Sequence, residues 1–293
     1  MFGECHAHIF MNGTDYKKAA AMYRNGIDRE EIREDIRQKL KIYQEHEISF
    51  VRDGGDRYGA SEYAREIAGE YGIDYRSPIF AIHKEGCYGG IVGKSFGSMS
   101  EFHQLVLTVR ERRGDFIKIM LSGIMNFETD GSITSTALAR NEIREMVHIA
   151  HEEGFAVMAH VNGAQAVLDA AEAGVDSVEH GNFLNQDALD AMAEYHTIWI
   201  PTFVTITNLL GDGRFSDEVI LKLKEKGGYF IKKAMHMGIH IGLGSDAGAY
   251  RVEHGTGIED EYKALSSLAD DQETADRCFR ETEQMIKERF LYR

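Results

Sequence analysis

The feature that most constrains the fold is an alternation of short apolar runs with longer segments of helical periodicity. Several runs are β-branched on both faces, as are strands of a parallel sheet covered by helices. Between them, apolar residues recur at spacings of three and four, as at Ile32, Ile36 and Leu40. Eight strand-then-helix units predict a closed (β/α)8 TIM barrel in preference to an open doubly wound sheet. The predicted strands are 3–10, 48–54, 77–82, 116–122, 155–161, 177–183, 197–205 and 239–245.

Length, charge and cysteine usage exclude several other classes. A (β/α)8 barrel uses about 250 residues, so one such domain would take up nearly all of the 293 present. A net charge of −15 argues against binding to nucleic acid or to an anionic membrane surface. We see no uncharged apolar run long enough for a transmembrane helix and no secretory signal. Three cysteines, Cys5, Cys87 and Cys278, form no C-x-x-C motif, which favours a reducing cytoplasm.

Two histidines stand near the end of the first predicted strand, in the sequence Cys5-His6-Ala7-His8. Residues two apart in a strand point to the same face, so His6 and His8 project together. Two imidazoles that converge on one point can form a metal-ligand pair. Histidines two apart also occur by chance, so the interpretation depends on polar residues at other strand ends, where a barrel of this kind carries its active site.

A lysine, Lys118, lies in the middle of the fourth apolar run, between Ile117 and Ile119. Burying a lysine is costly without compensation, so one interpretation is a salt bridge to a carboxylate on a neighbouring strand. The other is a chemical modification, because a desolvated lysine loses its proton easily. The free amine can take up carbon dioxide and become a carbamate, an oxygen ligand able to bridge two metal ions. In either case Lys118 points into the barrel if Phe116 and Met120 do.

Further polar residues stand at the ends of later runs. His160 lies at the end of the fifth, His180 in the sixth and Asp246 just after the eighth. A lone strand-end histidine is more often structural, and an aspartate before a turn often caps a helix. Beside a histidine pair and a buried lysine, the same residues favour a metal site. There Asp246 could bind metal and accept a proton from water.

The order of these residues along the chain resembles that of the amidohydrolase superfamily. It consists of a histidine pair, a mid-strand lysine, two strand-end histidines and a final aspartate. The local sequences are similar to the subgroup of imidazolonepropionase-like enzymes and zinc-dependent Xaa-Pro dipeptidases. The resemblance spans residues 3 to about 265. The matching segments are 51–55 (VRDGG), 117–120 (IKIM), 173–181 (AGVDSVEHG), 201–202 (PT) and 244–246 (GSD).

The resemblance implies a centre of two divalent metal ions, with zinc as the first expectation. A hydroxide between the metals would attack the substrate carbonyl, which the metals polarise. Asp246 would be the catalytic base that accepts the water proton and passes it to the leaving group. The implied ligands are His6, His8 and Asp246 for the more buried ion, His160 and His180 for the second, and a carboxylated Lys118, derived from carbon dioxide, bridging both.

The chain also departs from the family pattern. Most members begin a small β-sandwich before the first barrel strand and complete it after the barrel, whereas this chain starts two residues before its first predicted strand. We therefore expect a single-domain barrel over residues 1–293 that lacks the usual β-sandwich. Relatives also often carry a second histidine shortly after the fifth-strand ligand, where this chain has Asn162.

Several residues after the strands are candidates for contacts with substrate. Together with Arg52 and Asp53, Arg57 could clamp a substrate carboxylate, or these residues could pair with one another. The glycine-rich loop 86–97 could be a lid or an ordinary mobile loop. His254 follows the eighth strand, where relatives contact substrate. The candidate substrate contacts are Arg57, His83, Tyr88 and His254.

We expect the reaction to be hydrolysis of an amide-type C–N bond in a small molecule, such as a dipeptide, cyclic amide or ureido compound. The same metal site could support hydrolysis of a lactone or a phosphoester. A lyase with one metal, such as a decarboxylase, is disfavoured by Lys118 and the two later histidines. The alternative outside enzymes is a catalytically inactive metal-binding barrel. The substrate, the metal and any assembly into a homo-oligomer stay open.

Overall fold

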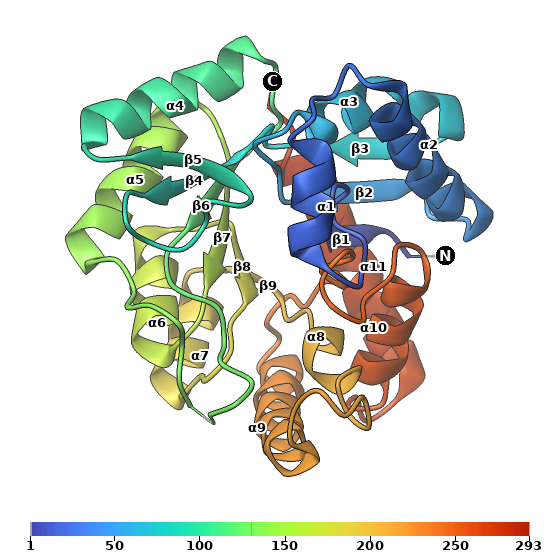
Figure 1. The fold of residues 1–293 in the computed structure, drawn as a ribbon. Coiled ribbons are helices and arrows are strands. Elements are labelled where there is room, and N and C mark those ends of the chain that lie inside the picture. The colour runs from blue at the N-terminus through green and yellow to red at the C-terminus, as the bar shows by residue number, and fades with distance from the viewer. Residues whose placement is uncertain (1, 130, 293) are drawn as a thin grey trace.

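The structure is a computed structural model that describes residues 2–129 and 131–292. Its strands lie at the centre and its helices outside them, with the first third of the chain facing the middle third across the barrel (Figure 1). The strands are β1 (Glu4–Ala7), β2 (Phe50–Asp53), β3 (Asp74–Arg76), β4 (Ala81–Lys84), β5 (Gly93–Phe96), β6 (Ile117–Met120), β7 (Val157–Val161), β8 (Ser177–His180) and β9 (Ile198–Ile200).

The helices follow the strands, as the alternation of patterns predicted. In α2, the periodic residues Ile32, Ile36, Leu40 and Tyr43 are all fully buried against the sheet. The helices are α1 (Tyr16–Tyr23), α2 (Glu30–Glu45), α3 (Ala60–Ile67), η1 (Ala68–Tyr71), α4 (Met99–Glu111), α5 (Arg140–Glu152), α6 (Ala164–Ala173), α7 (Gln186–Glu194), α8 (Val204–Thr207), α9 (Asp217–His236), α10 (Thr256–Ser266) and α11 (Gln272–Arg289). Among the described helices, none combines the length and apolar character that crossing a bilayer requires.

All strand pairs are parallel and fall into two sheets, of order β1-β2-β3 and β5-β4-β6-β7-β8-β9. The segment 240–246 connects β9 to β1 and takes the position of the predicted eighth strand. On one side, Trp199 N donates to His240 O at 2.9 Å. On the other, Cys5 N donates to Leu243 O at 2.9 Å and Asp246 N to His6 O at 2.8 Å. The segment is therefore bonded on both edges and closes this side of the barrel.

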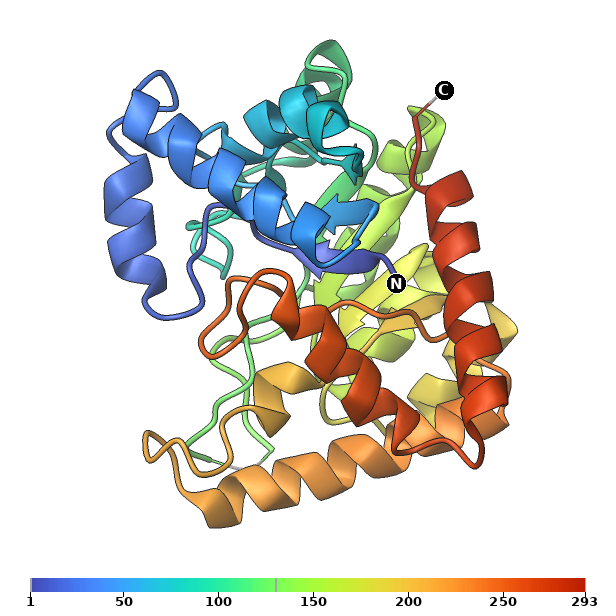
Figure 2. The same ribbon diagram turned by 90° about the vertical axis from the view of Figure 1, so that its right-hand side faces the viewer.

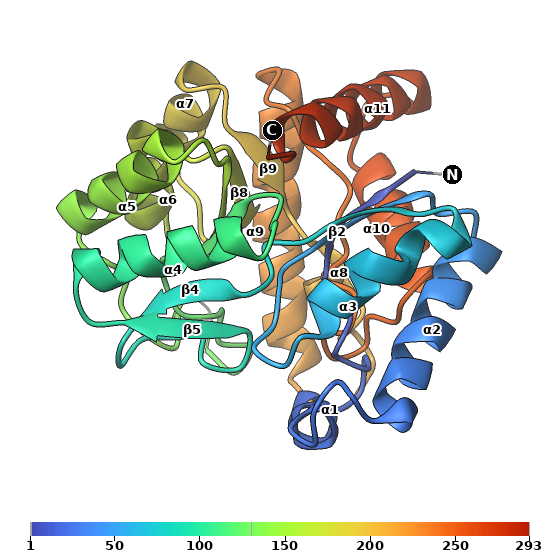
Figure 3. The ribbon, with the colours of Figure 1, turned by 90° about the horizontal axis from the view of Figure 1, so that it is seen from above.

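The third predicted strand, 77–82, differs from the structure. The chain there forms two short strands: β3 pairs with β2, and β4 pairs with β6. They are separated by Pro78, which lacks a backbone N–H, and Ile79, whose φ of 68° lies in the left-handed region. The sequence did not predict β5, which pairs with the other edge of β4; Figure 3 shows the two strands side by side.

Inside the barrel, apolar side chains fill the end opposite the candidate ligands. The layer consists of Cys5, Phe50, Phe116, Met158, Ile198 and Ile200, capped by Ile286 and Phe290. Ile286 lies in α11, and Phe290 directly follows this helix. In Figure 2 the helix runs close to the N-terminus. Side chains two residues further along a strand point to the same interior, so Lys118 follows Phe116 and His160 follows Met158 toward the open end.

Candidate metal centre and active site

Three non-glycine residues just at or beyond strand ends adopt left-handed backbone conformations at the mouth of the barrel. The φ angles are 67° at His180, 48° at Thr202 and 62° at Asp246. Such a conformation costs roughly 1–2 kcal/mol for a residue with a Cβ, and strained residues of this kind cluster at functional sites. Here the strain accompanies a turn of the backbone that brings the His180 and Asp246 side chains to the cavity above the strands.

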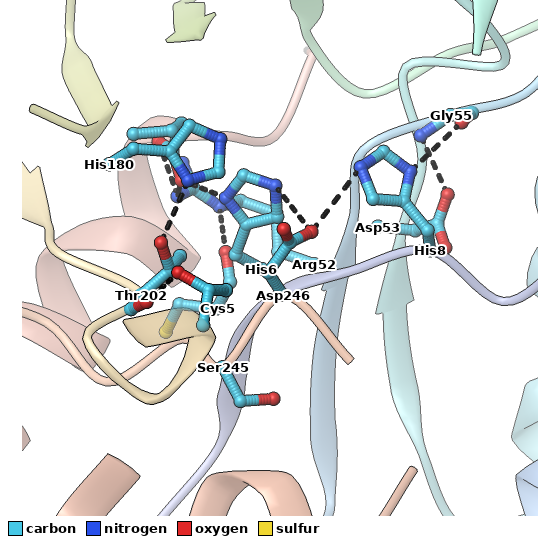
Figure 4. Close-up of polar contacts among 12 residues, drawn as sticks. Cys5, His6, His8, Arg52, Asp53, Gly55, His180, Thr202, Ser245 and Asp246 are labelled. Atoms are coloured by element: carbon cyan, nitrogen blue, oxygen red, sulfur yellow. Dashed lines mark hydrogen bonds and ion pairs between the residues drawn. The ribbon is translucent and has the colours of Figure 1, made fainter. Parts of the chain in front are cut away.

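The side chains of His6, His8 and Asp246 converge on one point. One ligand-type atom of each lies within 4.8 Å of the others. His6 Nε2 and His8 Nε2 each lie 3.6 Å from the same oxygen, Asp246 Oδ1. Figure 4 shows the carboxylate between the two rings. The structure therefore brings together the three residues that the sequence assigned to the more buried metal.

Hydrogen bonds on the far side of each ring fix its orientation. His6 Nδ1 lies 2.7 Å from Glu179 Oε2, and His8 Nδ1 lies 3.3 Å from Gly55 O. If each Nδ1 carries the proton, each Nε2 presents a lone pair toward Asp246. His6 Nε2 is buried and has no hydrogen-bond partner among the described residues. Histidines that bind metal characteristically donate their other ring nitrogen in this way.

The second pair of histidines lies beside the first. The ring centroids of His160 and His180 are 4.6 Å apart, and those of His6 and His180 are 5.0 Å apart. His180 Nδ1 can donate to Thr202 Oγ1 at 2.7 Å, and this hydroxyl donates to Pro201 O. His160 Nε2 lies 3.3 Å from Gly123 O, which leaves its Nδ1 for another partner. Each of the two rings keeps one nitrogen free of hydrogen bonds to the residues that the structure describes.

Burial keeps these four histidines neutral. Desolvation, followed by the Lys118 charge, lowers the pKa of His8 to about 3, and that of His160 to about 3. The pKa values of His6 and His180 are lowered well below their usual range, again chiefly by burial. A neutral imidazole has the lone pair that a metal requires, so no proton has to leave these rings at ordinary pH.

Lys118 is buried at the same end of the barrel. Only 1% of the residue is exposed, and its Nζ has no hydrogen-bond partner among the described residues. Desolvation lowers its pKa to about 8, with the charge of Glu179 acting in the opposite direction. The salt bridge considered from the sequence is not formed within the described part of the chain. Lys118 is thus an amine of reduced basicity that lines the same cavity as the histidines.

The donor set fits a metal ion. His6 Nε2 and Asp246 Oδ1 face each other at 3.6 Å, and this buried nitrogen has no hydrogen-bond partner among the described residues. Two ligand atoms on a tetrahedral zinc ion, each about 2.0–2.1 Å from the metal, lie about 3.4 Å apart. Burial raises the pKa of Asp246 to about 7, with the Lys118 charge opposing the shift. A bound cation would favour the ionised form of this carboxyl group.

Two buried carboxylates that the sequence analysis missed support the ligands from behind. Glu179 accepts from Arg52 Nη2 at 2.9 and 3.1 Å and lies against His6, and all three side chains are fully buried. Arg52 therefore pairs within the protein and does not clamp substrate. Glu4 accepts from Ser245 N at 2.8 Å and from His6 N at 3.1 Å, which ties the strand of His6 to the residue before Asp246. The sequence signal that could have identified Glu4 and Glu179 is a charged residue inside an apolar run.

A cavity of about 860 Å³ opens above these residues. Of the four candidate substrate contacts, Tyr88 lines it, with its ring centroid 5.1 Å from that of His160. Arg57, His83 and His254 are not among the lining residues. Arg57 donates to Gly90 O at 2.9 Å, and His83 lies beneath the glycine loop, its Nδ1 3.0 Å from Lys84 O.

His254 lies behind the cavity wall with both ring nitrogens engaged. Its Nδ1 is 2.8 Å from Tyr43 Oη and its Nε2 is 3.0 Å from Met11 O. The residues that sequence reasoning missed on the cavity come from loops and from α1. They include Lys17, Phe127, Arg214, Phe215 and Tyr250. No local pattern marks these positions, because only the fold brings them to one wall.

Histidine, lysine and carboxylate side chains thus gather at the carboxyl ends of the barrel strands, where barrel enzymes carry their active sites. The amidohydrolase family model matches residues 4–286, so the chain belongs to the amidohydrolase family. Family membership and the observed architecture confirm the expected (β/α)8 fold.

Solved structures share this fold. The chain is similar to a Xaa-Pro dipeptidase with bound methionine, at 19% identity and a TM-score of 0.73, over 98% of this chain and 75% of that one. It is similar to the ochratoxinase of Aspergillus niger, at 18% identity and a TM-score of 0.71, over 94% and 68% of the two chains.

Curated relatives match over shorter regions. An uncharacterized protein of Mycobacterium tuberculosis is 31% identical over 132 residues, or 43% of this chain and 35% of that protein. The Aspergillus niger ochratoxinase is 25% identical over 189 residues, or 62% of this chain and 38% of that protein. The match thus spans little more than a third of the length of these relatives.

Proposed function

We propose that this protein is a metal-dependent amidohydrolase that hydrolyses an amide-type C–N bond in a small molecule. The observation that carries the proposal is the convergence of His6, His8 and Asp246. Their ligand-type atoms lie within 4.8 Å of one another at the floor of a large cavity. An unpartnered buried imidazole nitrogen, such as His6 Nε2, that faces a carboxylate oxygen favours a cation between them.

The site we propose is binuclear. His160 and His180 lie next to the first set of ligands with one ring nitrogen each left free. Lys118 has a pKa of about 8, so a fraction of it is free amine at neutral pH and able to form a carbamate with carbon dioxide. Its unpartnered Nζ is consistent with a bridging role. The nitrogen-rich donor set favours zinc.

When bound, the metal ions would supply Lewis acidity that polarises the scissile carbonyl and makes a water molecule more acidic. The protein's own residues would orient and transfer protons. Asp246 can accept a proton from the attacking water and return it to the leaving nitrogen as the C–N bond breaks. Glu179 and Thr202 hold the rings of His6 and His180 in place. Tyr88, beside His160, would contact the substrate.

The related proteins support an amide substrate. Xaa-Pro dipeptidase and prolidase are named among the structural neighbours, and we extend from them only the class of bond. We also propose that residues 1–293 act as one catalytic domain in a reducing cytoplasm. Cys5, Cys87 and Cys278 are all unpaired, which supports that compartment.

The test is turnover of a panel of dipeptides, N-acyl amino acids and lactones by metal-free and zinc-loaded protein. We expect amide hydrolysis only after loading, and a loss of at least about 1,000-fold in Asp246→Asn, which removes a ligand and the proton acceptor together. Asp187→Asn, in the exposed first turn of α7, is the control. Equal turnover without metal, or hydrolysis of lactones alone, would contradict the proposal. Tight metal binding with no turnover of any substrate would indicate an inactive barrel.

A further inference from the structure

The structure holds Thr202 in a backbone conformation that a β-branched residue rarely adopts. Its φ of 48° lies in the left-handed region, where such residues are outliers. In this conformation its Oγ1 lies 2.7 Å from His180 Nδ1 and donates to Pro201 O at 2.7 Å (Figure 4). Because the hydroxyl proton goes to Pro201, the oxygen can only accept from His180. The contact therefore places the ring proton on Nδ1 and leaves His180 Nε2 as the lone-pair donor.

The turn that follows Thr202 cannot hold this conformation alone. Helix α8 is a single turn, and an isolated helix this short is unstable in water. Local hydrogen bonds close the turn, since Thr205 N and Thr205 Oγ1 donate to Thr202 O at 3.1 and 2.8 Å. These bonds lie within the turn and do not fix it against the rest of the barrel. A group from another element has to do so.

Glu261 supplies that group from α10, which packs against α8 (Figure 1). Its side chain is fully buried, and Oε1 accepts from Phe203 N at 2.9 Å while Oε2 accepts from Val204 N at 2.8 Å. These are the two residues directly after Thr202. Burial raises the pKa of Glu261 to about 8, and the two N–H donors oppose the shift. In either protonation state both oxygens keep a lone pair for an N–H group.

We propose that Glu261 is a positioning residue for His180 and acts through the turn at Thr202. This inference rests on the proposed function, in which His180 binds the second metal ion. Glu261 itself does not line the cavity. It fixes the backbone after Thr202, which keeps Thr202 in its left-handed conformation. The Thr202 hydroxyl then orients the His180 ring and leaves Nε2 free for a metal ion.

The first measurement is made on the metal-free full chain labelled with ¹⁵N-histidine, in which NMR reports the ring tautomer of His180. The spectrum of His180→Gln assigns the signal. Glu261→Gln keeps the side-chain shape and one acceptor, but its amide nitrogen cannot accept from the second N–H. Thr202→Val keeps the β-branched shape and removes the hydroxyl. We expect the Nδ1–H tautomer to dominate in the wild type and to lose that dominance in both variants.

Zinc competition with a chelator is the second measurement. Thr202→Val should weaken binding of the second ion about 10- to 100-fold, as loss of a partner behind a ligating histidine does. Glu261→Gln should weaken it at least about threefold and lower kcat more than it raises KM. If the two residues act in series, the double variant should bind the second ion within about twofold of Thr202→Val alone. The first ion should bind equally well in all three variants.

Glu259→Gln is the matched control. It lies in the same helix and removes a half-buried carboxylate that pairs with His46 at 2.7 Å. We expect it to keep the wild-type tautomer and the wild-type metal affinity. If Glu261→Gln does not fold, Glu261→Asp takes its place with the same expectations, because it withdraws the carboxyl group from the turn by one methylene group.

The outcomes separate this inference from the function on which it rests. The inference is wrong if Glu261→Gln keeps the wild-type tautomer and second-ion affinity, or if the two substitutions weaken zinc binding additively. Glu261 would then only stabilise the fold. If the tautomer of His180 in the metal-free protein depends on Glu261, but the wild type binds fewer than two zinc ions or hydrolyses no amide, the inference stands and the proposed function fails.

Discussion

Glu179→Gln is expected to weaken both folding and metal binding, because two buried partners share this carboxylate. Arg52 Nη2 donates to its oxygens at 2.9 and 3.1 Å, and His6 Nδ1 lies 2.7 Å from Oε2. Glutamine keeps the shape but leaves the Arg52 charge unpaired inside the barrel, which costs about 3–5 kcal/mol of stability. His6 keeps only a neutral acceptor, and loss of a carboxylate behind a ligating histidine weakens metal binding about 10- to 100-fold.

Urea unfolding of the metal-free protein and metal competition with a chelator measure the two effects separately. Combining Arg52→Met with Glu179→Gln removes the unpaired charge, so the double variant should regain about 2 kcal/mol or more over the single one while its metal binding stays weak. Glu153→Gln removes a half-buried partner of Arg110 and His103 outside the candidate metal site and should leave metal affinity unchanged. The reasoning is refuted if Glu179→Gln matches the wild type within about 1 kcal/mol and binds metal equally well, or if the double variant is no more stable than the single one.

Two further predictions concern the ligands themselves. Gly54→Ala should weaken metal binding about 10- to 100-fold, because a Cβ at Gly54 would lie 2.3 Å from His8 Cε1 and displace the ring. Gly69→Ala is the control, since a Cβ at Gly69 meets nothing within 4 Å. Equal metal affinity of the two variants in chelator competition would contradict this prediction. Metal affinity should also fall with falling pH. Metal must displace protons from Lys118, with a pKa of about 8, and from Asp246, with a pKa of about 7, so the slope of log affinity against pH should steepen below pH 8 and again below pH 7. A constant affinity between pH 6 and 8.5, measured by calorimetry, would exclude both groups as proton-releasing ligands.

The barrel and the convergence of the ligand residues were predictable because both follow from strand periodicity. Residues two apart in a strand share a face. This rule predicted that His6 and His8 point to the same side, and that Lys118 points to the same side as Phe116. Parallel strands end at one rim, so polar residues far apart in sequence had to meet there. This reasoning depends only on local pattern and on the barrel, and it needs no knowledge of the loops.

The sequence could not show where tertiary contacts override local pattern. The third strand is broken at Ile79, whose left-handed backbone is accommodated by the hydrogen bond from Asp56 N to its carbonyl oxygen at 3.2 Å. His254 looked available for substrate, but its ring is held by Tyr43 and Met11, more than 200 residues earlier in the chain. The cation at Arg214 reaches the cavity only because a loop folds back over the barrel. Such long-range pairs leave no periodic signal.

The central claim is a binuclear centre bridged by a carboxylated Lys118. The most direct measurement is ¹³C NMR of protein loaded with zinc and ¹³C-bicarbonate, together with metal analysis of the same sample. The account predicts a carbamate signal and two metal ions per chain in the wild type, and loss of the signal and of at least one ion in Lys118→Ala. A wild type without a carbamate signal, and a Lys118→Ala variant with unchanged metal content, would contradict it.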